Sequence, residues 1–558
     1  RPEVSDLQLG LVPFEDIRLT AHVDTGKEEE PELLRQLIDP DRYYPVYGDA
    51  AEEVQDVRSR ERLYVLLEAD QSKLQIGNFR AQLNGQQLFQ YQRSFFGANL
   101  DVDHEFVKGS RTQVKAFVAD GGAGTRHRQL VFQGTGGAMY FLRDDALIEG
   151  SERVQLVVRD AVSGARLTVI PQTRDVDYTM QYRDGRLMFM QPIPSTVNAN
   201  WRINQNPVRT LDGHRVFVEI EYDYESFLAE DSEDAYAAQI RQTFADTVTV
   251  GGGVVQEERE GSQYRLFGAD ARAKVLPHTE VTAEFAYSEA IDIDTLASFD
   301  GGVTFGRIGS PEEVLSDGDP SAVDGWAGSF AIRGDAQDLA ALVDGGAASE
   351  ERVLKFPYEL VLQHQAPGFY SGTNVLEQGQ TKFGAQLQAP LTGVDTIRFR
   401  HDGIWSTLFT GEDFDEQDVV RHITATGYER KGDGWSAGAE IGHSYSEING
   451  AGASQRATAN LFGRIKITPR LSLLGEQEFT TEFSVSGDAP QSEQRVQGTA
   501  DQFATTVGGE YVLTDELSVT ATNALRWSGT NSAQVGLRAK LMESSSVSTY
   551  SPPTVVAN

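Results

Sequence analysis

The sequence contains no cysteine, which excludes disulfides and thiolate metal sites. It also lacks any run close to the roughly eighteen apolar residues of a membrane helix, so helical insertion into a bilayer is excluded. Basic residues are scarce, because 49 Lys and Arg stand against 83 Asp and Glu and give a formal net charge of -34. We therefore exclude nucleic acid as a partner, since a polyanion binds clustered basic residues. The mean hydropathy of -0.38 is typical of soluble proteins, but strands with only one apolar side also give a polar average.

What the sequence does have is a repeated alternation of apolar and polar residues, with a period of two. In "ADARAKVLPHTEVTAEFAYS", Ala and Val alternate with charged residues before a short break, and Val, Ala and Phe alternate with polar residues after it. Similar breaks occur in "APLTGVDTI", "KITPRLSLL" and "YVLTDELSV". The alternating runs are roughly nine to thirteen residues long, which is the length that a tilted strand needs to cross a bilayer. The pattern predicts an all-β protein: a large antiparallel transmembrane β-barrel of about eighteen strands or more, with an inserted compact β-domain.

The expected connections differ in length between the two ends of the strands. Tight turns join the strands at one end, and long polar segments join them at the other: the acidic Glu289–Gly325 and Thr410–Asp418, and the irregular 487–502. This asymmetry is typical of outer-membrane barrels, with short turns in the periplasm and long loops outside. It disfavours a soluble, secreted multi-sheet protein, which is the third interpretation of the pattern.

Four segments are predicted along the chain. Residues 1–55 form an N-terminal periplasmic or extended segment, and residues 56–120 form the first barrel strands. Residues 121–225 form the inserted β-domain, which either plugs the lumen or docks in the periplasm, and residues 226–558 supply the remaining strands and the long acidic loops. Within the insert, "YRDGRL" indicates a hairpin, and Met188–Met190 is interpreted as a buried core strand.

The charged side of the alternating strands is predicted to line a wet lumen. The candidates are Asp270, Arg272, Lys274, Glu284, Arg398, Arg400, Glu440, Arg464, Lys466, Glu476, Glu510 and Arg526. Basic residues near the tight turns would give a weak preference for anions. The alternative is that these are ordinary solvated or paired residues inside a barrel with no transport role.

The sequence lacks the common motifs of catalytic and phosphate-binding sites. The sequence has no GxSxG, HExxH or GxxxxGK[ST] motif, so we do not expect an enzyme. No cofactor is expected except calcium, for which Asp317, Asp319 and Asp324 in "SDGDPSAVDG" offer hard oxygen ligands. The alternative for these acids is a solvated loop.

A family resemblance agrees with the pattern. The series "YYPVYGDA", "LYVLLEAD…LQIGNF", "GTGGAMYFLRDDALIEGSERVQLVVRD" and "PGFYSGTN…QGQTKFGAQL" resembles large outer-membrane β-barrel proteins of Gram-negative bacteria. The segment "GSERV…D…TRDVDY…YRDGRL" is similar to part of the type IX secretion translocon. The resemblance runs from about Tyr43 to the end of the chain. One departure is the terminal "ESSSVSTYSPPTVVAN", because such barrels usually close on a strand that ends in an aromatic residue.

The resemblance implies a place in the bacterial outer membrane, in contact with its lipid, with lipopolysaccharide and with other envelope proteins. The expected function is that of a channel or translocon component that passes or exports a substrate without catalysis. The alternative is a surface-anchored structural or adhesive barrel whose acidic loops bind a partner. The family suggests no cargo.

Overall fold

The computed structural model consists of β-strands arranged in three sheets. It describes residues 17–23, 63–69, 71–83, 87–120, 125–159, 166–197, 214–225, 234–259, 262–290, 295–307, 323–335, 338, 356–371, 378–410, 415–448, 452–486, 503–514, 517–526, 531–542, 545–550 and 554–555. Among these residues, no helix has the length and apolar character that crossing a membrane requires.

The largest sheet has 22 strands, and its neighbours pair antiparallel. It begins with β1 (Ile17–Val23), β2 (Leu63–Ala69), β3 (Ser72–Leu83), β4 (Tyr91–Val107) and β5 (Ser110–Asp120). It continues with β14 (Asp234–Phe244), β15 (Val248–Arg259), β16 (Ser262–Leu276), β17 (Thr279–Ala290), β20 (Val323–Asp335), β21 (Pro357–Gln365), β22 (Gln380–Pro390) and β23 (Asp395–Thr410). It ends with β24 (Asp415–Gly432), β25 (Trp435–Ile448), β26 (Gly452–Lys466), β27 (Leu471–Ser486), β28 (Phe503–Thr514), β29 (Leu517–Arg526), β30 (Asn531–Met542), β31 (Ser545–Tyr550) and β32 (Thr554–Val555).

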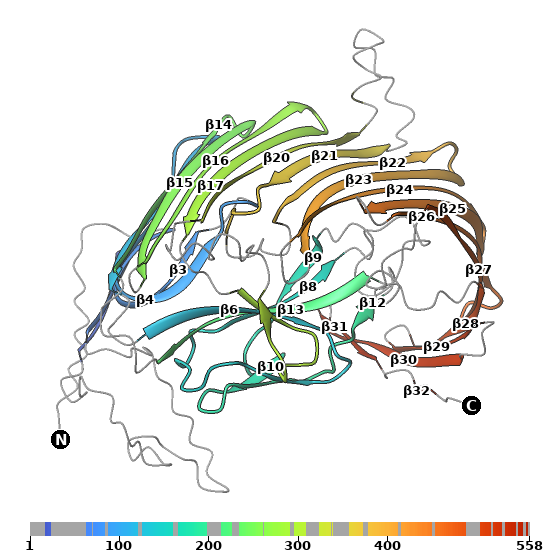
Figure 1. The fold of residues 1–558 in the computed structure, drawn as a ribbon, viewed down its shortest axis with the longest axis horizontal. Helices are drawn as coiled ribbons and strands as arrows, with labels where there is room; N and C mark the ends of the chain where they lie inside the picture. Colours follow the sequence, from blue (N-terminus) through green and yellow to red (C-terminus); the bar gives the residue numbers. More distant parts are fainter. Residues whose placement is uncertain are drawn as a thin grey trace, which may run out of the picture.

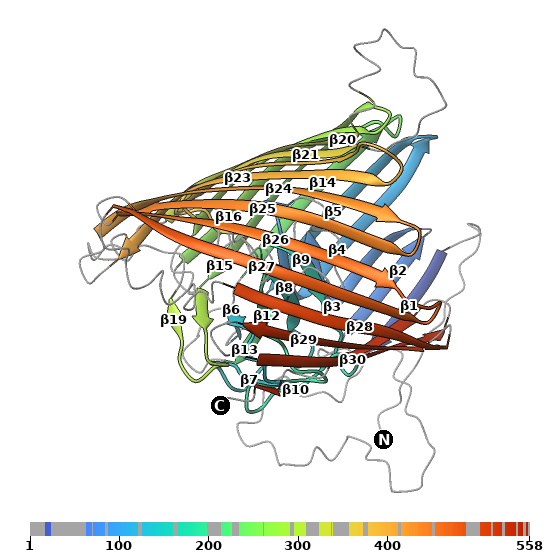
Figure 2. The same ribbon diagram turned by 90° about the vertical axis from the view of Figure 1, so that its right-hand side faces the viewer.

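This sheet curls around the smaller sheets of the chain, as Figure 1 shows, and the tilt of its strands is clear in Figure 2. The prediction of an all-β fold built on a large antiparallel sheet is confirmed. Closure of the sheet into a barrel is not seen among the described residues, because no pairing joins β1 to β30, β31 or β32. In the described part of the chain, the sheet is therefore an open, curved wall.

Two smaller sheets form the insert, which lies on the concave side of the wall (Figure 1). The seven-stranded sheet contains β6 (Thr125–Gln133), β8 (Arg153–Arg159), β9 (Arg166–Pro171), β12 (Thr196–Val197), β13 (His214–Glu225), β18 (Thr295–Ser298) and β19 (Gly306–Arg307). The three-stranded sheet contains β7 (Met139–Phe141), β10 (Tyr178–Gln181) and β11 (Arg186–Phe189). The two sheets enclose an apolar core that includes Phe132, Ile220 and Tyr140.

The hairpin predicted at "YRDGRL" joins β10 and β11, whose register pairs Gln181 with Arg186. The prediction of a buried core strand at Met188–Met190 holds for Phe189 and is wrong for the two methionines. Phe189 is buried, but Met188 and Met190 are 48% and 53% exposed. The physical reason is the period of two, because only one face of this small sheet packs on the core.

The wall has two kinds of edge. At what we call the turn end, short connections join β4 to β5, β14 to β15, β16 to β17, β22 to β23, β24 to β25 and β26 to β27. At the opposite end, called the loop end, the chain leaves β5 for the insert and leaves β17 for β18 and β19. The sorting by length is incomplete. At the turn end β20 ends at Asp335 and β21 begins only at Pro357, whereas at the loop end β23 ends at Thr410 and β24 begins at Asp415.

Three segments extend beyond their expected roles. β1 lies in the predicted N-terminal segment, yet it pairs with β2 as part of the wall. β18 lies in the predicted acidic loop after Glu289, yet it pairs parallel with β6 of the insert. The expected loop at Thr410–Asp418 shrinks, because β24 already begins at Asp415. In each case strand pairing satisfies backbone groups that a loop would leave to water.

Candidate functional site

All twelve predicted lumen residues occupy one face of the wall, the concave inner face. Directly paired residues of neighbouring strands share a face, and the register carries that face from strand to strand: Asp270 pairs with Glu284, and Glu284 pairs with Ser329. Direct pairing continues the same face through Gln363, Lys382 and Ile404. Asp402, two residues from Ile404 and therefore on the same face, pairs with Ile423, from which the pairing runs through Ser444, Arg456 and Glu482. The in-phase positions include the remaining candidates on β23 to β29. Only the strand position of Arg526 is described, not its side chain.

Many of these charges are paired with one another or with further residues of the wall. Arg398 lies 2.5 Å from Glu429, and Arg400 lies 2.5 Å from Asp402. Arg464 pairs with Glu510, and Arg241 lies 3.3 Å from Asp270. Asn460 donates to Glu476. This pairing weakens the predicted basic zone, because much of its charge is balanced within the wall.

Exposure of the inner face changes along the strands. Arg400 and Glu440 are buried at 3% and 1% exposure. Arg272, Lys274, Arg464 and Lys466, which are close to the turn end, are exposed. The inner face is therefore wet near the tight turns and more enclosed further along the strands.

The insert is fastened to the wall by a buried ionic cluster. Arg93 on β4 pairs with Glu257 of β15 and also approaches Asp223 of β13, with 3.4 Å between its Nε and Oδ1. His127 of β6 lies 2.8 Å from the same Asp223 oxygen. Tyr91 donates to Glu257 at 2.9 Å. Since buried charges are costly unless paired, this cluster fixes where the insert sits.

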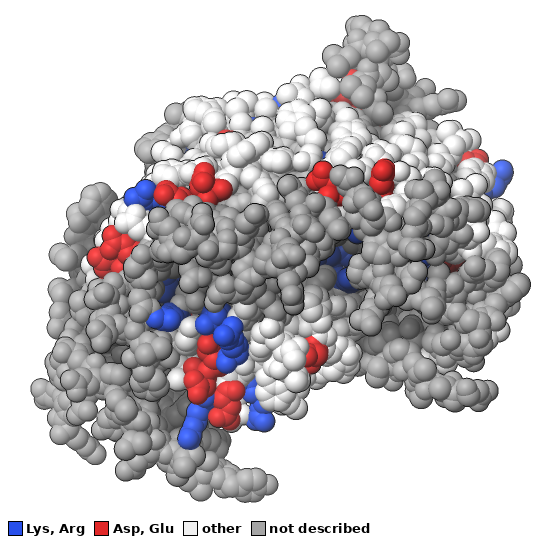
Figure 3. All heavy atoms as spheres, in the orientation of Figure 1, with Lys and Arg blue, Asp and Glu red and all other residues white. Residues whose placement is uncertain are grey.

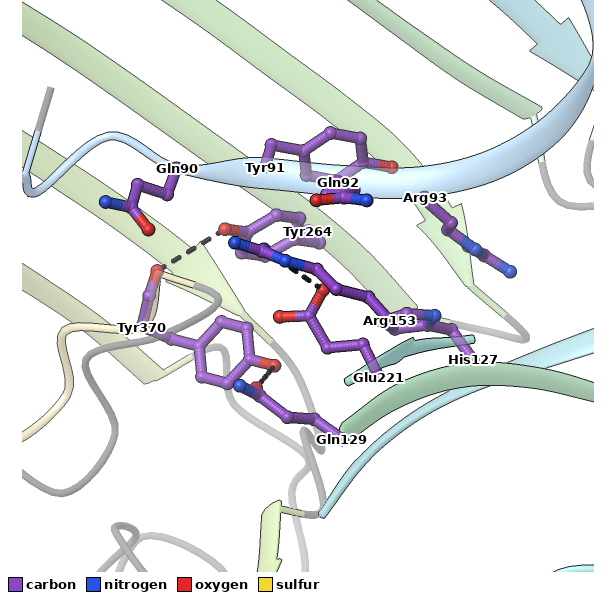
Figure 4. Close-up of a pocket in the computed structure, with 10 residues that line it drawn as sticks. All are labelled: Gln90, Tyr91, Gln92, Arg93, His127, Gln129, Arg153, Glu221, Tyr264 and Tyr370. Carbon is purple, nitrogen blue, oxygen red and sulfur yellow. Dashed lines mark hydrogen bonds and ion pairs between the residues drawn. The ribbon is translucent and has the colours of Figure 1, made fainter. Parts of the chain in front are cut away.

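Three further hydrogen bonds lie beside the cluster. Arg80 of β3 donates to the backbone oxygen of Glu152 at 2.6 Å. Tyr370, in the connection after β21, donates to Gln129 of β6 at 2.9 Å, and its carbonyl accepts from Tyr264 at 3.4 Å. Figure 4 shows the small pocket between these groups, with Tyr91, Tyr264 and Tyr370 on one side and residues of the insert on the other. The seam between insert and wall is polar and aromatic.

Apolar packing continues the seam from the ionic cluster toward the turn end. Leu88 and Phe89, between β3 and β4, are fully buried against the inner face. Gly253 and Gly268 pair across β15 and β16, and a Cβ at Gly268 would lie 2.5 Å from the ring of Phe89. Glycine is required here because the aromatic ring rests directly on the backbone. The same wall that carries charges elsewhere is made of small residues where the loop docks.

The acids of β13 have opposite pKa shifts. Burial alone would raise the pKa of Asp223, but the hydrogen bond from His127 and the charges of His127 and Arg93 outweigh it and hold the pKa below its ordinary value. Burial dominates at Glu221 and raises its pKa, although Arg153 opposes this. The seam therefore favours the charged form of Asp223.

The outer face of the wall is apolar between two groups of aromatic residues. Ile441 and Leu461 are exposed on it at 67% and 53%. Aromatic side chains gather toward the loop end at Trp326, Trp405 and Tyr445, and toward the turn end at Tyr428, Trp435 and Tyr511. In Figure 3 the visible convex surface is mostly uncharged, and coloured residues gather at its rim and on the insert. Two aromatic girdles around an apolar band are typical of a sheet that faces lipid.

The calcium candidates do not come together in the described residues. Asp324 lies in β20 and accepts a hydrogen bond from Tyr287 at 3.2 Å. Asp317 and Asp319 lie outside the described residues. Within the part of the chain that the structure describes, no group of three or more His, Asp or Glu side chains is placed to hold a metal ion.

Sequence reasoning missed Arg93, His127, Asp223 and Glu257. A signal for part of this set was available in "HRVFVEIEYDY", where acids occupy every second position of an otherwise apolar strand. Such a strand has one face on an apolar core and needs basic partners opposite its other face. The identity of those partners required the fold.

Comparison with known proteins gives structural likeness without sequence relationship. No family model matches the chain, and no curated protein matches it. The siderophore receptor PirA from Acinetobacter baumannii is similar over 86% of this chain and 71% of its own, with a TM-score of 0.33 and 7% identity. The translocation pore of the P pilus usher PapC is similar over 88% of this chain and 90% of its own, with a TM-score of 0.31 and 7% identity. The ferric enterobactin receptor PfeA is similar over 84% and 74%, with a TM-score of 0.31 and 11% identity.

These TM-scores lie below 0.5, so no function is transferred from these proteins. The similarity to the type IX translocon stays a prediction from the sequence.

Proposed function

We propose that the chain is a channel of the bacterial outer membrane, in which the large sheet spans the bilayer and the insert is a plug. The observation that carries this proposal is the division of the wall, with an apolar outer face between aromatic girdles and an inner face of paired charges. Lipid would meet the outer face, and a substrate would pass along the inner one. No chemistry is assigned to the protein.

The seam supports the plug. Its strongest contacts are ionic and buried, and most of them reach strands of the N-terminal part of the wall. A plug fastened at one side can move without the wall unfolding. Export or translocation as part of a secretion system, and contacts with other envelope proteins, are finer possibilities of the same proposal.

Conductance in planar bilayers tests the function. Arg93→Met leaves Asp223 and Glu257 buried without their common partner, which costs about 3–5 kcal/mol for a buried pair. We expect this variant to open more often and to larger steps than the wild type. The matched control is Arg272→Met, which breaks an exposed pair with Glu280 at 3.4 Å and should cost about 0–1 kcal/mol.

A locked variant sharpens the test. Because the chain has no cysteine, Gln129→Cys with Tyr370→Cys can be joined selectively by a short bis-maleimide across the seam. The cross-link should suppress the conductance that Arg93→Met adds. The same protein without the cross-linker should keep that added conductance. If folded Arg93→Met gives no steps at all, the barrel is an anchor, and the adhesive alternative is favoured.

A further inference from the structure

The middle of the outer face is polar on β23 and β24, where lipid would favour apolar side chains. His401 lies near the centre of β23, and His422 and Thr424 lie near the centre of β24. The register places these residues close to the depth of Ile441, because Thr424 pairs with His443, two residues from Ile441 along β25. An imidazole costs free energy in hydrocarbon unless its nitrogens are hydrogen-bonded. This part of the outer face therefore needs a partner other than lipid tails.

The outer face of β14–β17 is different at the middle of its strands. Its outward positions there are all apolar or glycine: Ala238, Ile240, Gly252, Val254, Ala269, Ala271, Ala283 and Phe285. Ile240 and Phe285 are more than half exposed. The wall thus has one side that suits lipid at this depth and another that does not.

The imidazoles differ in how far the wall itself satisfies them. Nδ1 of His401 lies 2.8 Å from the hydroxyl of Thr424. Nε2 of His443 lies 3.3 Å from Oε1 of Gln455 on β26. The ring of His422 stacks on that of His401 with centroids 6.0 Å apart, but among the described residues His422 makes no hydrogen bond. The unmet need is therefore centred on His422 of β24.

The outer face is smooth around His422, because Gly403 of β23 pairs directly with it. A Cβ at Gly403 would lie 3.0 Å from the ring of Trp405, and that ring meets His422 edge-on with centroids 5.6 Å apart. Glycine therefore lets the indole lie close to the strand. We call this area the contact strip; it consists of Phe383, Ala385, His401, Gly403, His422 and Thr424.

We propose that the contact strip packs against the contact strip of a second copy of the chain within the membrane. This inference rests on the proposed function, because the strip lies in the membrane only if the wall spans it. The wall is convex on this side (Figure 1), and two convex walls touch only along a narrow line of a few strands. Ile441 lies on β25 beside the strip and stays on the lipid side.

The strip is complementary to itself. Both copies have their loop ends on the same side of the membrane, so their two-fold axis runs along the membrane normal and brings like residues together at equal depth. A neutral imidazole has one donor and one acceptor nitrogen, so the two copies of His422 can bond each other. The strip contains no Asp, Glu, Lys or Arg, and outward charges lie beyond it, at Asp418 toward the loop end and at the Arg430–Asp395 pair toward the turn end. The contact therefore brings no like charges together.

Equilibrium sedimentation of the folded full chain in detergent tests the pairing. We expect the wild type to be a dimer and His422→Phe to form a dimer about tenfold weaker, because it loses the hydrogen bond at the centre of the strip. The matched control is His104→Phe, because His104 is an exposed outward histidine that pairs with Thr112 near the turn end, outside the strip. That variant should dimerise like the wild type.

Cross-linking in lipid vesicles tests the same surface without removing a hydrogen bond. The chain has no cysteine, so Ala385→Cys places a single thiol in the strip. The matched control is Ala271→Cys, which places one on the apolar outer face of β16, where Ala271 is exposed. A short bis-maleimide should join two copies through Ala385→Cys in high yield, and through Ala271→Cys only at the level of random collisions.

Several outcomes would overturn the proposal. These are a monomeric wild type in sedimentation, equal cross-linking yields from the two cysteine variants, or an equal loss of dimer in His104→Phe. If His422→Phe does not fold, cross-linking of Ala385→Cys decides. A monomer that gives conductance steps rejects the second copy and leaves the channel, whereas failure of the wild type to insert into bilayers rejects the proposed function itself.

Discussion

At the scale of the residue, Asp223 is the point where the insert and the wall are joined. It is 2% exposed, and it faces Arg93 from the wall and His127 from the insert. Glu257 and Glu221 are the other acids beside it, and Arg153 opposes Glu221. A carboxylate in this position must remain ionised for the cluster to hold together.

The pKa of Asp223 predicts how docking depends on pH. Its folded pKa lies below the ordinary 3.8, so its contribution to stability is complete above that value and is lost as the pH falls through the folded pKa. A spin label at Gln129→Cys should therefore become mobile at acidic pH. In Asp223→Asn the label should be mobile already at neutral pH and change little on acidification. A wild-type label that is already mobile above the ordinary carboxyl pKa of 3.8, or whose mobility never changes on acidification, would contradict this.

At the scale of the element, the paired glycines of β15 and β16 decide where the connection before β4 docks. Gly268→Val would drive a side chain into the ring of Phe89, which we expect to cost about 1–3 kcal/mol as overpacking does. Gly475→Val is the control, because a Cβ there meets nothing within 4 Å. Urea unfolding in lipid vesicles should show a lower midpoint for the first variant only. Equal midpoints would mean that the loop is free to move away from the wall.

The same elements show how much of the structure can be predicted from the sequence. Alternation predicted which side of β16 and β17 carries charge, because a period of two assigns the face of each residue whatever its neighbours are. It did not predict the seam, because Arg93 and Asp223 are 130 residues apart. Nor did it predict that Met188 would be exposed, since a strand pattern shows two faces but not which of them is covered.

At the scale of the whole molecule, the insert and three connections meet on the inner face near the loop end. The connection before β4 supplies Phe89, the segment after β17 supplies β18, and the segment after β21 supplies Tyr370. The exposed basic residues Arg272 and Lys274 lie near the turn end, away from this assembly. In the proposed channel, a substrate that enters from the turn end would therefore meet the exposed, charged part of the wall first and the insert second.

The membrane position of the wall gives the last prediction. Ile441 is 67% exposed in the middle of β25 on the outer face. Ile441→Arg should lower the stability of the protein folded in lipid vesicles by about 2–4 kcal/mol, as arginine does at the midplane on the lipid side of a barrel. Thr506→Arg is the matched control, because Thr506 pairs with Glu476 on the inner face, where a new cation gains a carboxylate. Equal stability of the two variants, read from the heat-dependent mobility shift on gels, would place the outer face in water and remove the basis for a membrane channel.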